Sequence, residues 1–152
     1  MMKSRFLIFN LILGMALTTV ISSPSYANDV KIYQQKLQNI DNSTQNCTER
    51  QKNQDGNIYT ICSLKGKIVR ASEGNIEAAA GLEFWFQNGK VVAIRRSHED
   101  TTFFYRNHRL EAELFTRSDG KTIVKTKFTK SERQELENLA RNGFKSIFRV
   151  FQ

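Results

Sequence analysis

Short apolar runs separated by turn residues fill the middle of the chain, and this pattern predicts a series of antiparallel strands. The predicted strands are residues 58–64, 67–70, 82–87, 91–96, 103–105, 109–116 and 121–128. Asn88-Gly89 is the strongest short-range hairpin signal among them, because both central positions of a type I′ turn need positive φ. Residues 109–116 alternate between small or apolar and charged side chains, which is typical of a half-buried strand.

An internal echo runs through this region. Residues 84–90 align with residues 103–109 at an offset of 19, each segment being an aromatic run followed by an Asn-containing turn and a basic residue. The pattern resembles the strand–turn–strand units of MORN-type hairpin repeats over about 35 residues. The glycine pattern of those repeats is absent, since His108 stands where the first segment has Gly89. We therefore interpret the echo as a recurring hairpin and not as family membership.

Helical periodicity flanks the strands on both sides. In residues 29–40 four apolar side chains share one helical face, which predicts a short helix with Asp29 as its N-cap. Thr129 and Glu132 form a capping box at the start of a long amphipathic C-terminal helix, which Gly143 is expected to divide. Residues 41–57 are polar and predict a loop.

These elements predict an α+β fold with an antiparallel β-meander of about five to seven strands. A block of strands followed by a helix is typical of this class, so the C-terminal amphipathic helix is expected to pack on one sheet face. The short N-terminal helix completes the fold. No change in composition divides residues 28–152, which we interpret as a single small domain.

The first 27 residues have the features of a cleavable signal peptide. Lys3 and Arg5 precede a mostly apolar run, and Ser25 and Ala27 suit the −3 and −1 positions of a signal-peptidase site. An uncleaved membrane anchor is the alternative, but the run is shorter than the roughly 20 apolar residues that a spanning helix needs. We expect an exported protein, periplasmic or secreted, that begins at Asn28.

Charge and cysteine content agree with export. Removing the two basic residues of the signal from the net charge of +8 leaves +6, which favours an anionic envelope polymer, a lipid surface or a protein partner. Export makes nucleic acid the least favoured partner. Cys47 and Cys62 predict one disulfide, because an even pair in an exported chain is usually bridged. A redox pair is the alternative, but it usually has two intervening residues.

No catalytic, metal or cofactor signature stands out. Ser97, His98, Glu99 and Asp100 are consecutive, whereas a Ser–His–Asp triad is assembled from distant parts of a fold. The chain has only two histidines, and both cysteines are assigned to the disulfide, so we expect no metal site and no cofactor. The lysines from Lys121 to Lys130 indicate a protected edge strand, with a binding stripe as the alternative.

The aromatic and basic residues of the middle strands carry the most specific expectation. Alternation places Trp85 and Phe104 on the sheet face opposite the other aromatic side chains of their strands. If that face is exposed, it forms a binding surface, for which the candidate residues are Trp85, Phe104, Arg95, Arg106 and Arg109. The alternative, that the N-terminal helix covers this face, is favoured by the usual burial of aromatic residues.

The sequence therefore favours an exported, non-enzymatic binding protein of unknown ligand. One alternative is a small envelope hydrolase with its site near His98. The other is a structural or stress-related envelope protein without a small ligand.

Overall fold

The computed structural model describes residues 24–75 and 77–152. The helices are α1 (Pro24–Thr44), the 3-10 helix η1 (Ser97–Glu99), α2 (Lys130–Asn142) and α3 (Lys145–Val150). The strands are β1 (Thr48–Gln54), β2 (Asn57–Leu64), β3 (Lys67–Asn75), β4 (Ala80–Gln87), β5 (Lys90–Arg96), β6 (Thr101–Arg106), β7 (Arg109–Thr116) and β8 (Thr122–Lys125). Most of the predicted signal peptide lies outside the described residues, and its expected cleavage site after Ala27 falls within α1.

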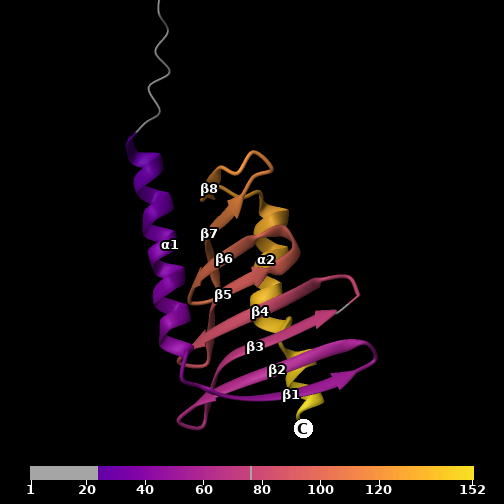
Figure 1. Ribbon diagram of the computed structural model, residues 1–152. Coiled ribbons are helices and arrows are strands. Elements are labelled where there is room, and N and C mark those ends of the chain that lie inside the picture. The colour runs from indigo at the N-terminus through magenta and orange to yellow at the C-terminus, as the bar shows by residue number, and fades with distance from the viewer. Residues whose placement is uncertain (1–23, 76) are drawn as a thin grey trace, which may run out of the picture.

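The fold is α+β, as predicted, with all eight strands in one antiparallel sheet in sequence order (Figure 1). The strand that the sequence did not predict is β1, which lies in the polar segment expected to be a loop. All seven of its residues are exposed and none is apolar, so periodicity gives no signal. Its pairing extends along β2, from Thr48 opposite Ser63 to Gln54 opposite Asn57. The predicted disulfide between Cys47 and Cys62 also joins the start of β1 to β2.

The hairpins share one turn geometry. Two consecutive residues with positive φ join each of the pairs β1–β2, β2–β3, β4–β5 and β6–β7, as in type I′ turns. The last three of these hairpins also share a β-bulge. The unpaired residue is Val69, Val92 or Glu111, in each case three positions after the second turn residue. The echo seen in the sequence therefore corresponds to a recurring bulged hairpin.

Each face of the sheet carries its own apolar cluster. Phe84, Phe103 and Tyr105 belong to the cluster beneath α2 and α3, whereas Trp85 and Phe104 belong to the cluster beneath α1. Figure 1 shows α1 on one side of the sheet and α2 on the other. The sheet is thus covered on both faces. This is the alternative that the usual burial of aromatic residues favoured. The expectation of an exposed Trp85–Phe104 surface is wrong, because these side chains are 1% and 0% exposed.

The N-terminal helix is longer than predicted. Its apolar face is correct, since Val30, Tyr33, Leu37 and Ile40 pack on the cluster beneath it. Asp29 lies inside α1 and is not its N-cap, because residues 24–28 before it are already helical. No helix in the described part of the chain is long and apolar enough to cross a membrane.

The C-terminal segment follows the prediction. The Thr129 side chain accepts from Glu132 N, and Glu132 accepts from Thr129 N, which completes the capping box. The helix is interrupted at Gly143, where a Cβ would lie 2.6 Å from Leu139 Cδ1 and 3.1 Å from Phe84 Cζ. The predicted strand over residues 121–128 is shortened to β8, which forms one edge of the sheet.

Candidate functional site

Trp85 and Arg95 lie together beneath α1. The Arg95 guanidinium stacks 5.0 Å from the Trp85 ring centroid, and it forms ion pairs of 3.6 Å with both Asp41 of α1 and Glu83 of β4. Burial, which outweighs the attraction of Arg95 and Arg70, raises the pKa of Glu83. This group therefore connects α1 to the sheet and presents no aromatic surface to solvent.

Phe104, Arg106 and Arg109 are separated by the structure. Phe104 is buried against Tyr33, with ring centroids 5.1 Å apart. Arg106 is 76% exposed near the β6–β7 turn, where Nη2 donates to Glu111 Oε1 at 2.6 Å. Arg109 is exposed opposite Arg106 in the same hairpin. Of the five residues predicted to bind a ligand, the structure brings Trp85, Phe104 and Arg95 together under α1 and leaves the two other arginines at the turn.

A cleft of about 800 Å³ opens beside these buried residues. It lies between α1 and the turns that join β4 to β5 and β6 to β7. Its apolar lining on the α1 side includes Ile32 and Ile40 of α1 and Val92 of β5, and its cations are Lys36, Lys90 and Arg106. Small-molecule sites are typically clefts of roughly 300 to 1,000 Å³ with apolar walls and a few placed polar groups.

The β-bulges shape this cleft. A bulge adds one residue to a strand and re-aims the side chains around it. Val92, the unpaired residue of β5, packs on the α1 side and lines the cleft. Glu111, the unpaired residue of β7, reaches Lys36 of α1 with an ion pair of 2.6 Å. Two of the three bulges thus connect hairpin ends to α1.

The mouth of the cleft is positively charged. Glu111 accepts from both Lys36 Nζ and Arg106 Nη2 at 2.6 Å. Partial burial raises the pKa of Glu111, but the hydrogen bonds and charges of Lys36 and Arg106 outweigh it and lower the pKa overall. Lys90 adds a third cation, with Nζ 3.3 Å from Asn107 Oδ1. Glu111 pairs with two of the three cations that line the cleft, which leaves an excess of positive charge for an anionic ligand.

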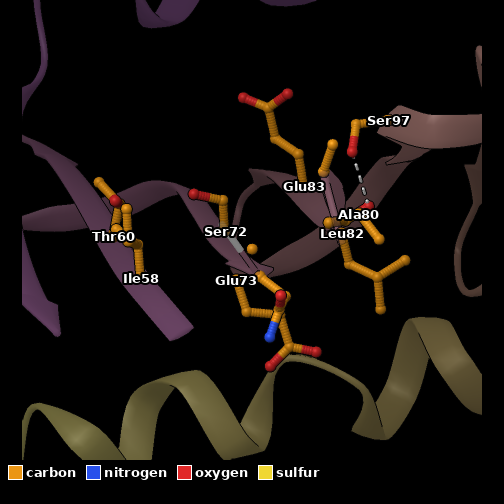
Figure 2. Close-up of a pocket in the computed structure, with 12 residues that line it drawn as sticks. Ile58, Thr60, Ser72, Glu73, Ala80, Leu82, Glu83 and Ser97 are labelled. Atoms are coloured by element: carbon orange, nitrogen blue, oxygen red, sulfur yellow. Dashed lines mark hydrogen bonds between the residues drawn. The ribbon is translucent and has the colours of Figure 1, made fainter. Parts of the chain in front are cut away.

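A second, shallower hollow of about 360 Å³ lies at the other end of β3 and β4 (Figure 2). It exists where Gly74 and Gly81 pair across the strands and place no side chain on the sheet. A Cβ on Gly81 would lie 2.8 Å from Glu73 O, so close backbone approach explains this glycine. Two carboxylates line the hollow: Glu83 is already paired with Arg70 and Arg95, and Glu73 accepts from Ser146 Oγ at 3.3 Å. We therefore consider the cleft the better candidate.

The segment around His98 does not form a triad. The Ser97 hydroxyl donates to Gly81 O at 3.3 Å, and Figure 2 shows it on the same side of the strands as Glu83. His98 lines a different hollow, and its Nε2 lies 3.5 Å from Glu99. Asp100 lines a third hollow near α1. Within the described residues, no cluster of three potential metal-ligating side chains occurs.

Sequence reasoning missed most of the cleft, although one signal pointed to it. Ile32 is apolar yet lies outside the buried face of α1, and it is 52% exposed. No sequence pattern marks Lys36, Lys90 or Glu111. These residues come together only because α1 crosses over the hairpin ends. No family model, curated protein or solved structure matches this chain.

Proposed function

We propose that the protein is an exported, non-enzymatic binding protein whose ligand site is the cleft between α1 and the β4–β5 and β6–β7 turns. The cleft itself carries the proposal, because it combines an apolar lining with three cations in a volume suited to a small ligand. The aromatic side chains beneath α1 act as its support, since they position the helix that forms one wall.

Two further observations support this function. The Cys47–Cys62 disulfide favours an oxidising compartment, as expected for an exported protein. It also secures the chain three residues after the end of α1, so one end of the cleft wall is covalently tied to β2. The excess of positive charge at the mouth favours an anionic ligand from the envelope.

A cleft-blocking variant tests the proposal. Asn39 is exposed on α1 and lines the cleft, so Asn39→Trp should fill it without entering the core. Gln38→Trp on the same helix is the matched control, because Gln38 is exposed and does not line the cleft. The purified protein is incubated with envelope extract and examined by native mass spectrometry. A small molecule retained by the wild type and Gln38→Trp but lost from Asn39→Trp is expected. Equal retention by all three, or by none, overturns the proposal.

A further inference from the structure

The cleft places exposed apolar surface directly beside its cations. Ile32 is the one exposed large apolar side chain in the described residues, and it lies on the cleft side of α1. The lining continues through Val92 of β5 and Ile40 of α1, which both pack on the cluster beneath α1. An extended alkyl chain could be covered along this path from the rim to the floor. The apolar part therefore suits a hydrocarbon tail better than a folded protein surface.

The cations at the mouth are oriented and incompletely used. Lys36 and Arg106 both donate to Glu111, which fixes their charged ends at one point. Among the described residues, Arg106 donates to Glu111 through Nη2, and its side chain is 76% exposed. Its remaining donors are accessible to a second carboxylate, which a guanidinium can bind with two parallel hydrogen bonds. The geometry thus suits one small anionic group beside Glu111.

We infer that the ligand is an amphiphile with one anionic head group and an alkyl tail, its head beside Lys36 and Arg106 and its tail over Ile32 and Val92. This inference rests on the proposed function, because it uses the same cleft. The cations cluster at the mouth of an apolar hollow, and a long anionic polymer would instead need a row of them on an open surface. Glu111 is the specificity-determining residue, since its carboxylate competes with the head group for both cations.

Calorimetric titration with ten-carbon probes of different charge tests the inference. Sodium decanoate, decyl maltoside and decyltrimethylammonium are each used below their micelle concentrations. Decanoate is expected to bind at least tenfold more tightly than the other two. Arg106→Gln should weaken decanoate binding about tenfold, because a charge-assisted hydrogen bond is lost. Arg109→Gln removes the same charge outside the cleft lining and should leave the affinity unchanged.

Two further measurements address the tail and Glu111. Affinity should rise about fourfold with each methylene from hexanoate to decanoate, as expected when each group leaves water. Glu111→Gln removes the competing carboxylate and should tighten decanoate binding several-fold, with decyl maltoside unaffected. Unchanged or weaker binding of decanoate to Glu111→Gln overturns the assigned head-group position.

The outcomes separate this inference from the proposed function. If all three decyl probes bind alike and Asn39→Trp blocks them all, the cleft binds ligands but the anionic head group is wrong. If no decyl probe binds while the cleft still retains an envelope ligand, the amphiphile is wrong and the proposed function stands. If neither probes nor extract yield a ligand that Asn39→Trp excludes, both are overturned.

Discussion

At the scale of single residues, Gly143 illustrates how packing can reverse a local preference. Alanine is favoured over glycine in a helix by about 1 kcal/mol, and Gly143 has right-handed helical dihedrals. A Cβ at this position, however, would lie within 3.1 Å of Leu139 and Phe84 atoms. The requirement for glycine therefore comes from the close packing of Gly143 against Leu139 of α2 and Phe84 of the sheet.

Gly143→Ala is accordingly expected to lower the free energy of unfolding by about 1–3 kcal/mol, because the added methyl group overpacks this contact. Urea denaturation followed by circular dichroism measures the change. Asn142→Ala is the control, since Asn142 is exposed, and it should alter stability by no more than about 0.5 kcal/mol. A Gly143→Ala protein as stable as the wild type would show that Leu139 and Phe84 move aside without cost.

The two turn positions Gly89 and His108 form a second comparison at this scale. Both have positive φ, 73° for Gly89 and 63° for His108. His108 also has a buried Nδ1 without a hydrogen-bond partner. His108→Gly should raise the free energy of unfolding by about 1 kcal/mol, and Gly89→His should lower it by a similar amount. Thermal denaturation measures the change in stability of both variants. Changes of the same sign in the two variants would contradict the argument from backbone strain.

At the scale of elements, the start of α2 depends on the charge of Glu132. Its carboxylate accepts from Lys125 Nζ and from Thr129 N, both at 2.7 Å. The hydrogen bond from Lys125 contributes most, followed by those of Thr129, and together they lower the pKa of Glu132 to about 2. The residue thus joins the capping box of α2 to the edge strand β8.

This lowered pKa predicts a pH dependence of stability. Because the folded state favours the ionised carboxylate, the contribution of Glu132 is present above its ordinary pKa of 4.5 and is lost as the pH falls from there toward 2. Urea denaturation between pH 6 and pH 2 should show a shallower loss for Glu132→Gln than for the wild type. Glutamine can still complete the capping box. Glu135→Gln, an exposed carboxylate on the same helix, should keep the wild-type slope.

At the scale of the whole molecule, α1 determines what the second sheet face presents. The chain has a single tryptophan, so fluorescence reports on Trp85 alone. Leu37→Asp places a charge against the cluster beneath α1 and should displace the helix, which increases acrylamide quenching of Trp85. Gln38→Asp on the exposed face of α1 should leave Trp85 shielded. Retained strand signal in circular dichroism confirms that the sheet remains folded, and unchanged quenching in Leu37→Asp would show that α1 is not the cover.

The sequence predicted what local chemistry determines. Asn88-Gly89 specified a turn, Thr129 and Glu132 specified a helix start, and the alternation around Trp85 placed it correctly on the face opposite Phe84. It did not predict β1, whose residues are all polar and exposed, so that backbone pairing with β2 leaves no hydrophobic period to detect.

The cleft could not be predicted for a different reason. Lys36 and Glu111 are 75 residues apart and meet because α1 crosses the hairpins and because a bulge redirects β7. Neither the crossing of a helix nor the position of a bulge leaves a periodic signal in one sequence. Arg106 was named among the candidate residues, but its association with Ile32 and Lys36 required the assembled fold.

The single disulfide has a consequence for biogenesis. With two cysteines in the whole chain, oxidation has one intramolecular product, the Cys47–Cys62 bridge found here. The cross-link spans only 15 positions and joins the residue before β1 to β2, so the loop that must close to form it is short. Maturation thus needs an oxidant but no disulfide isomerase, and its characteristic error is a dimer linked between two chains.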